Sequence, residues 1–186
     1  GYAYEVIKNF SVSATFKYLF SDMGRIGNSR GASSVAFDLG VLYKCEINDW
    51  EGAGWSVGLH VSNLGPKINY LTSKDALPAT VKVGGAADLP FLQMNKLTLP
   101  ADLGYRLSPA DVQALSVSAG AEYAWRELVM LRGGYHCGDK KKGDASYATA
   151  GAGVEYAGVR LDFAWLFAGH EYLARNTFWV SLGYSF

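Results

Sequence analysis

A two-residue alternation runs along almost the whole chain and restricts it to β-structure. From Phe10 to Phe20 every second residue is apolar or aromatic, and the residues between are mainly serine, threonine and lysine. The stretch from Val159 to Phe167 repeats the pattern. Successive side chains of a strand point to opposite faces, so this spacing predicts strands with one apolar face. The apolar runs are far shorter than the roughly 20 residues of a membrane-spanning helix, which excludes a helical membrane protein.

The pattern recurs often enough to predict about eleven antiparallel strands, each long enough to cross a membrane at a tilt. Tight links alternate with long ones along the chain. In outer-membrane barrels the tight links lie at the periplasmic end and the long ones lie outside the cell. The predicted strands are the residues before Lys8 and the ranges 10–20, 35–43, 55–61, 80–86, 96–103, 115–123, 129–135, 148–156, 159–167 and 178–186.

We expect residues 1–186 to form a single β-barrel domain that is the C-terminal portion of a longer one. Gly1 opens directly onto a strand-like alternation. An odd number of strands does not close the usual even-numbered barrel. N-terminal strands are therefore expected to be missing before Gly1.

The two predicted faces differ in chemistry, and this difference favours lipid outside the barrel. One face carries charges of both signs and many glycines, as at Lys17, Asp38 and Arg132. The other carries tyrosine and tryptophan mostly towards strand ends, where such side chains prefer the boundary between lipid and water. A soluble β-barrel or sandwich is the alternative, with its apolar face packed inward. The net charge is zero, and the charge pattern suggests no nucleic-acid partner.

Six segments occur in an order that carries a family resemblance. They are Phe-Ser-Val-Ser-Ala-Thr-Phe-Lys-Tyr-Leu-Phe-Ser-Asp-Met at 10–23, Ala-Phe-Asp-Leu-Gly-Val-Leu-Tyr at 36–43, Val-Ser-Asn-Leu-Gly-Pro-Lys-Ile-Asn-Tyr at 61–70, Leu-Pro-Ala-Thr-Val-Lys-Val-Gly at 77–84, and the closing strands at 120–135 and 173–186. In this order they resemble the PorV family of outer-membrane proteins, which belongs to the type IX secretion system of Bacteroidetes. The related PorQ proteins share the fold and the pathway, and these segments do not separate the two.

The resemblance implies an all-β, transmembrane antiparallel barrel of about 14 strands when complete, similar to the FadL-type fatty-acid channels. It implies a protein of the bacterial outer membrane that is not an enzyme and needs no cofactor or metal. Its partners would be the C-terminal signal domains of secreted cargo, a SprA-type translocon, an attachment complex with a PorU-type sortase, and membrane lipid or lipopolysaccharide. The alternative is a FadL-type channel for hydrophobic solutes, which would require an apolar lumen pocket and a lateral opening.

By the same resemblance, six residues near the outer ends of strands are predicted to bind partners. They are Asn63, Leu64, Lys67 and Tyr70 after one strand, and Leu173 and Asn176 before the last. Loop asparagine and tyrosine also serve turn geometry alone, which is the competing interpretation. Between 97 and 112 the chain departs from the family, because a short link stands where a long outer loop is usual.

One group of residues on the predicted lumen face has the composition of a hydrolase site. Ser56, His60, Ser62 and Asp38 could meet on adjacent strands as a Ser/His/Asp arrangement. Serine and aspartate are also ordinary residues of a lumen wall, and alternation within a strand does not fix the register between strands. The wall interpretation is preferred.

Two further groups lie in or beside predicted outer loops. His136, and His170 with Glu171, are predicted to be solvated loop residues, because no cysteine or carboxylate spacing supports a metal site. The basic run Lys140–Lys142 either meets lipopolysaccharide phosphates as point charges or forms a solvated tip.

Overall fold

The described part of the molecule is a single large sheet with two short helical turns. The computed structural model describes residues 1–21, 32–69, 74–92, 94–126, 128–169 and 176–185. No helix in these ranges is long and apolar enough to cross a membrane. The elements are β1 (Tyr2–Ile7), β2 (Phe10–Ser21), β3 (Ala32–Glu46), β4 (Gly54–Leu64), β5 (Ile68–Asn69), β6 (Lys74–Asp75), β7 (Thr80–Phe91), β8 (Asn95–Arg106), the 3-10 helix η1 (Ala110–Val112), β9 (Leu115–Trp125), β10 (Val129–Cys137), the 3-10 helix η2 (Lys140–Lys142), β11 (Tyr147–Tyr156), β12 (Val159–Ala168) and β13 (Phe178–Tyr184).

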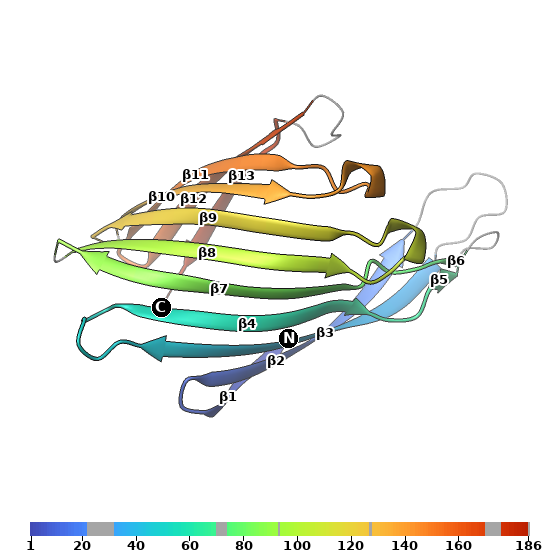
Figure 1. Ribbon diagram of the computed structural model, residues 1–186, viewed down its shortest axis with the longest axis horizontal. Coiled ribbons are helices and arrows are strands. Elements are labelled where there is room, and N and C mark those ends of the chain that lie inside the picture. The colour runs from blue at the N-terminus through green and yellow to red at the C-terminus, as the bar shows by residue number, and fades with distance from the viewer. Residues whose placement is uncertain (22–31, 70–73, 93, 127, 170–175, 186) are drawn as a thin grey trace.

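Eleven antiparallel strands form the large sheet in the order in which they occur along the chain. The order is β1-β2-β3-β4-β7-β8-β9-β10-β11-β12-β13, and β5 and β6 pair as a separate hairpin between β4 and β7. The sheet curls, so that β12 and β13 lie behind β7–β9 (Figure 1). Within the described residues no pairing joins β1 to β13, which leaves two open edges there. The predicted all-β architecture and the predicted number of strands are confirmed.

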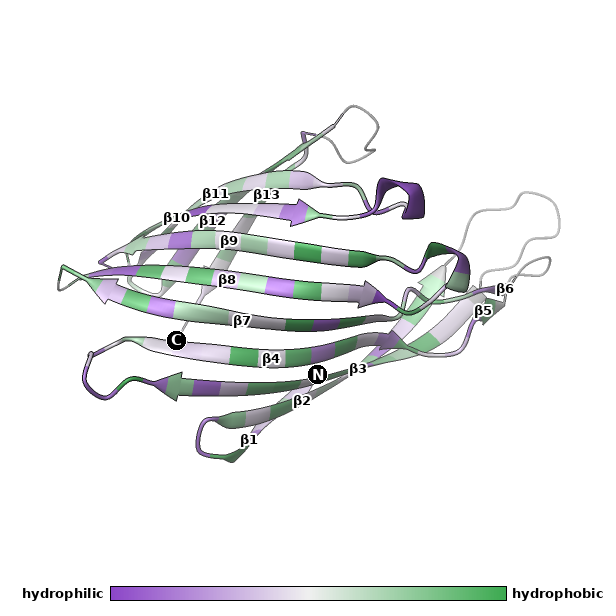
Figure 2. Ribbon diagram, in the orientation of Figure 1, coloured by the Kyte–Doolittle hydropathy of each residue, from purple (hydrophilic) through white to green (hydrophobic). Residues whose placement is uncertain are grey.

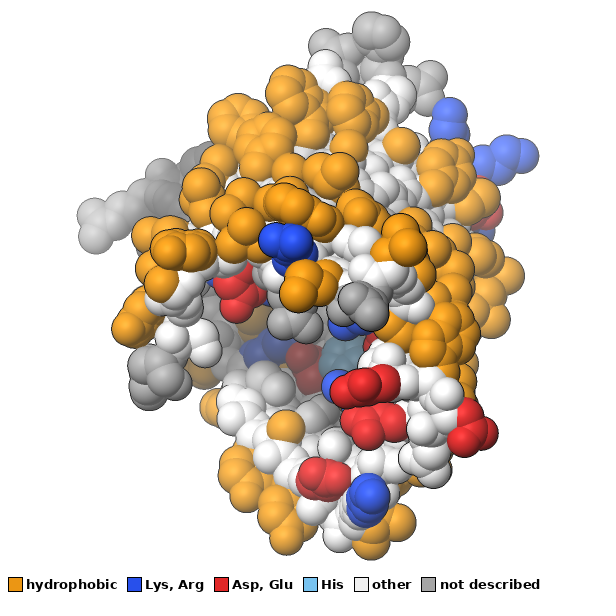
Figure 3. Space-filling view, turned by 90° about the vertical axis from the view of Figure 1, so that its left-hand side faces the viewer, with side chains coloured by type: hydrophobic (Ala, Val, Ile, Leu, Met, Phe, Trp, Pro, Cys, Tyr) orange, Lys and Arg blue, Asp and Glu red, His pale blue; other side chains and the backbone are white. Residues whose placement is uncertain are grey.

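The predicted faces are also confirmed, and the apolar face is the convex one. Phe16, Tyr18 and Phe20 are exposed on the outside of β2, whereas Lys17 turns to the concave side and meets Asp38 there. Hydrophobic and hydrophilic residues alternate along β7–β9 (Figure 2). Seen from the end that carries the short turns, hydrophobic side chains lie around much of a hollow that contains basic (Lys or Arg), acidic and histidine side chains (Figure 3). A sandwich would bury the apolar face between two sheets, so this single curled layer rules out the sandwich alternative.

The connections sort by length between the two ends of the strands, as predicted. Tight turns at Asn9, Arg126 and Ala157 lie at one end, and each of these residues has a left-handed backbone with φ between 50° and 72°. The links 47–53 and 92–94 lie at the same end. The other end, called the loop end below, carries the β4–β7 connection, the β8–β9 link with η1 and the β10–β11 link with η2.

Candidate functional site

The predicted partner-contact residues fall into two groups at the loop end. Asn63 and Leu64 end β4, and Lys67 lies in the link to β5. Asn176 lies in the turn before β13, which is seven places from β4 in the strand order. Tyr70 and Leu173 lie outside the described residues. The fold therefore brings Asn63, Leu64 and Lys67 together and leaves Asn176 apart from them.

Asn63 sits in a bulge at the end of β4. Leu39 of β3 pairs with Val61 and Phe37 pairs with Leu64, so two residues of β4 oppose the single residue between Phe37 and Leu39. Asn63 takes a left-handed φ of 57°, a conformation that asparagine adopts more readily than most residues. A bulge redirects side chains and bends the strand. Here it turns the asparagine amide towards the concave side, where the charges lie.

The Asn63 side chain and backbone complete a network around a buried carboxylate. Lys17 Nζ lies 2.6 Å from Asp38 Oδ2 and 3.2 Å from Asn63 Oδ1. The backbone N–H of Asn63 donates to Asp38 Oδ1 over 2.8 Å. A carboxylate as buried as Asp38 is stable only when it is paired and hydrogen-bonded. Three strands thereby contribute to one structural hub, which we call the Lys17–Asp38–Asn63 hub.

The hub holds the segment that leaves β4 and the one that returns to β7. Asn63 Nδ2 donates to the carbonyl of Pro78 over 3.1 Å. Ser34 Oγ donates to the carbonyl of Pro66 over 3.1 Å. The backbone N–H of Leu107 then ties the returning segment to the β8–β9 link at Ala79 O, over 2.8 Å. The connection is therefore fastened to the wall at several points.

Gly65 allows this connection to lie close against β3. A Cβ at this position would fall 2.9 Å from Leu77 Cδ1 and 3.2 Å from Ala36 Cα, closer than such contacts normally come. Leu77 and Ala36 are themselves buried. Leu64 and Lys67, on either side of this close approach, are exposed. Asn63 and Gly65 thus position the segment, while Leu64 and Lys67 are the side chains available to a partner.

Ion pairs line the concave wall on the other side of the curl. Arg132 of β10 forms a salt bridge with Glu122 of β9, and its Nη1 lies 2.5 Å from Asp162 Oδ1 of β12. Arg160 forms two further ion pairs: its Nε lies 2.7 Å from Asp162 Oδ2, and its Nη1 lies 3.6 Å from Glu155 Oε2. Glycines between these strands leave room for the long arginine side chains, as at Gly153. This part of the interior is polar and internally paired.

Of the four residues considered for a Ser/His/Asp arrangement, His60 and Ser56 line a hollow of about 490 Å³ on the inner wall. Ser62 Oγ instead donates to the carbonyl of Thr80 over 3.5 Å. Asp38 is engaged by the hub. Among the described residues no hydrogen bond joins His60 to Ser56, Ser62 or Asp38. The arrangement that would activate a serine is therefore not assembled there.

His136 corrects a prediction, because it is not a solvated loop residue. It lies in β10 with a side chain only 13% exposed. Its Nδ1 lies 3.0 Å from Ser118 Oγ, its Nε2 lies 3.1 Å from Asp144 Oδ1, and its ring stacks on Tyr147 with centroids 4.7 Å apart. Strand pairing sets Ser118 directly beside His136, whereas Asp144 reaches it from the β10–β11 link. His170 and Glu171 lie outside the described residues.

The His136 contacts fasten the β10–β11 link to the wall. Arg106 Nη1 donates to the carbonyl of Lys142 over 3.2 Å, and Lys142 Nζ donates to Asp111 O over 3.1 Å. Ser118 is paired with strands on both sides, so its neighbouring backbone N–H groups are engaged in the sheet and form no ready oxyanion hole. Within the described ranges no group of three His, Cys, Asp or Glu side chains could hold a metal ion. Sequence reasoning missed this cluster, although Ser118 and His136 share the polar face in the alternation.

Comparison with known proteins gives one family match. The model of the family described as Type IX secretion system protein PorV matches residues 1–113. The matched span runs from β1 through η1 and contains the Lys17–Asp38–Asn63 hub with the segment that it positions. No protein among the curated sequences matches the chain.

Proposed function

Because the chain belongs to the PorV family of type IX secretion system proteins, we propose that it is an outer-membrane component that binds the C-terminal signal domains of secreted cargo. The observation that carries the proposal is the segment from Asn63 to Lys67, which ends β4 and begins the connection to β5. It exposes apolar Leu64 and cationic Lys67 at the loop end, while Asn63 and Gly65 fix its backbone. A surface that is already ordered loses little conformational entropy when a partner binds. An apolar anchor beside a charge suits a protein partner.

Docking to the secretion machinery belongs to the same proposal. Asn176 is exposed at the loop end, well separated from β4 in the strand order. A second surface of this kind would let the barrel touch a SprA-type translocon, or an attachment complex with a PorU-type sortase, while cargo occupies the first. Lys140 and Lys141 are exposed at the same end and would meet the phosphates of lipopolysaccharide.

The proposed role is non-enzymatic, and a channel for hydrophobic solutes is the competing class. Ser62 is hydrogen-bonded to Thr80 and not to His60, which supports a role for these residues in the wall. The paired charges that Arg132 organises across β9–β12 oppose an apolar pocket in that part of the interior. Both observations favour protein recognition at the loop end over chemistry or transport inside the barrel.

Titration of a purified cargo signal domain onto the full chain in nanodiscs tests the proposal. We expect the double substitution Leu64→Asp with Lys67→Glu to weaken binding at least ten-fold, which corresponds to about 1.4 kcal/mol. Lys8→Glu repeats the charge change of Lys67→Glu at the opposite end of the strands and serves as the control. Equal affinity of the double variant and the unchanged chain would refute the assignment of this surface. A chain that binds fatty acid and no signal domain would establish the solute channel instead.

A further inference from the structure

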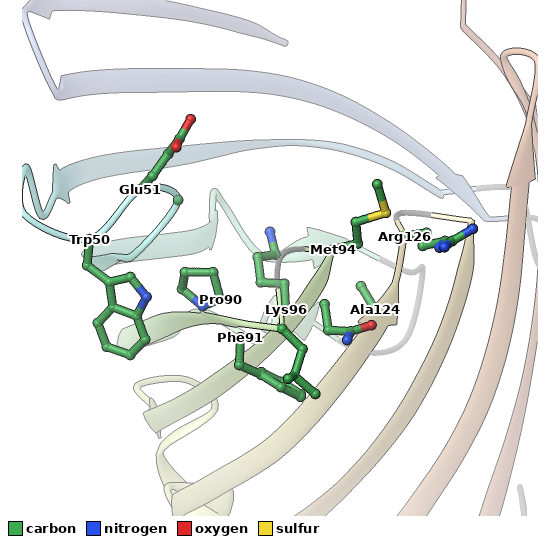
Figure 4. A pocket seen from close by; sticks show the side chains of 11 residues that line it. Trp50, Glu51, Pro90, Phe91, Met94, Lys96, Ala124 and Arg126 are labelled. Atoms are coloured by element: carbon green, nitrogen blue, oxygen red, sulfur yellow. The ribbon is translucent and has the colours of Figure 1, made fainter.

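A hollow of about 660 Å³ lies at the end of the barrel that carries the short turns, opposite the segment after β4. Three connections build it: the β3–β4 link, the β7–β8 turn and the start of the β9–β10 turn. Trp50 lies on one side and Met94 and Arg126 lie on the other, with Pro90 and Lys96 between them (Figure 4). In an outer-membrane barrel this end faces the periplasm.

The rim of the hollow exposes large apolar side chains where turns are normally polar. Leu92 is 80% exposed, Met94 59% and Trp50 48%. Leu92 also takes a left-handed φ of 50°, a conformation that suits glycine or asparagine better than leucine. Turn geometry therefore does not explain the leucine. Exposed apolar side chains that gather around one hollow are typical of a site where another molecule is bound.

Backbone hydrogen bonds hold the rim in place. The N–H of Arg126 donates to Met94 O over 2.7 Å, which joins two neighbouring turns. In the β3–β4 link, the N–H of Ala53 donates to Trp50 O over 2.9 Å, and Ala53 is fully covered. Ordered turns of this kind present their side chains without a large entropic cost on binding.

The charges of the hollow indicate which partner it fits. Lys96 and Arg126 supply two cations, and Glu51 is the only acid among the residues that line it. Lys96 Nζ lies 4.0 Å from Asp88 Oδ1, so Asp88 neutralises the charge of Lys96 only weakly. Lys96 belongs to the inward face of β8, as its partner Ala124 does on β9, so these two residues line the hollow from the barrel interior. Phe91 lines it from the outward face, where its ring contacts Tyr123.

We propose that this hollow docks a periplasmic protein through a segment that carries an apolar side chain flanked by carboxylates. The apolar side chain would pack among Trp50, Leu92 and Met94, and the carboxylates would pair with Lys96 and Arg126. The inference goes beyond cargo recognition. It rests on the outer-membrane placement in the proposed function and not on cargo binding.

Site-specific photo-crosslinking in intact cells tests this inference with the full chain. The probe is a benzoylphenylalanine at position 94, and the control probe is the same residue at position 8, in a turn at the same end but outside the hollow. We expect a protein adduct at position 94 and none at position 8. The double variant Lys96→Gln with Arg126→Gln should reduce the adduct at least five-fold. Leu92→Asn, which suits the left-handed turn, should reduce it without loss of folding.

The opposite results would overturn the inference. These are adducts with phospholipid alone, no adduct, an equally strong protein adduct at position 8, or an adduct that survives both the charge removal and Leu92→Asn. The affinity for the cargo signal domain, measured in nanodiscs, distinguishes a failure of this inference from a failure of the proposed function. Lys96→Gln with Arg126→Gln should leave that affinity within two-fold, because Leu64 and Lys67 lie at the other end of the strands.

Discussion

Replacing Lys17 by methionine leaves the Asp38 carboxylate without its cation inside the wall. Lys17 Nζ lies 2.6 Å from Asp38 Oδ2, and Asp38 is 8% exposed. The N–H of Asn63 still serves the other carboxylate oxygen, so one oxygen loses its partner. An unpaired buried charge destabilises the folded state more than the lost attraction alone. We therefore expect Lys17→Met to lower the free energy of unfolding.

The size of the effect follows from how deeply the two side chains are buried. Breaking a fully buried pair costs about 3–5 kcal/mol, whereas an exposed pair contributes about 0–1 kcal/mol. The side chain of Asp38 is 10% exposed and that of Lys17 is 37% exposed, so this pair lies between the two limits. We expect a loss of about 2 kcal/mol for Lys17→Met. Combining it with Asp38→Asn removes the stranded charge, so the double variant should lose less than the sum of the two single losses.

Urea unfolding of the purified chain in detergent, followed by tryptophan fluorescence, measures these values. Lys44→Met is the matched control, because Lys44 is an exposed lysine of the neighbouring strand β3. The control should change the free energy of unfolding by less than about 0.5 kcal/mol. The reasoning fails if Lys17→Met and Lys44→Met shift the unfolding midpoint equally, or if the losses of Lys17→Met and Asp38→Asn simply add.

Substitutions at Arg132, Gly65 and His136 test other parts of the molecule. Arg132→Met leaves the carboxylates of Glu122 and Asp162 without their cation and should lower the free energy of unfolding by about 2–3 kcal/mol in the same urea assay. Arg132→Lys should restore only part of this stability, because an ammonium group cannot bind two carboxylates as the planar guanidinium does. Gly65→Ala should lower the free energy of unfolding by about 1–3 kcal/mol, because the added methyl group overpacks the site. Gly133 has open space around it, so Gly133→Ala should change the free energy of unfolding by less than about 0.5 kcal/mol. His136→Phe keeps a ring against Tyr147 but loses the hydrogen bonds to Ser118 and Asp144. The β10–β11 link should then open more often, so trypsin should cleave faster at Lys140–Lys142. An unchanged cleavage rate would show that the contact between His136 and Asp144 does not restrain this link.

Individual residues show how far sequence reasoning reached into the site. The alternation correctly placed Lys17, Asp38 and Arg132 on the concave face. Asn63 and Leu64 were predicted from the resemblance to follow a strand, whereas they are the last two residues of β4. The alternation did not foresee that Asn63 would enter a bulge and become part of the hub, because a bulge changes the local register. His136 was misjudged for a related reason, since Asp144 approaches it from a link that the alternation does not describe.

The chain by itself determined which residues form strands, which face each side chain takes and where the tight turns fall. These properties are local, because the direction of a side chain follows from the two-residue period and a turn follows from its own few residues. Only the tertiary structure decided which charges meet, since Lys17 and Asn63 are 46 positions apart and come together through the register of β2, β3 and β4. It likewise gathered Trp50, Met94 and Arg126 from three separate connections around one hollow. Register and the packing of connections depend on pairings between distant strands, which a pattern within one strand does not contain.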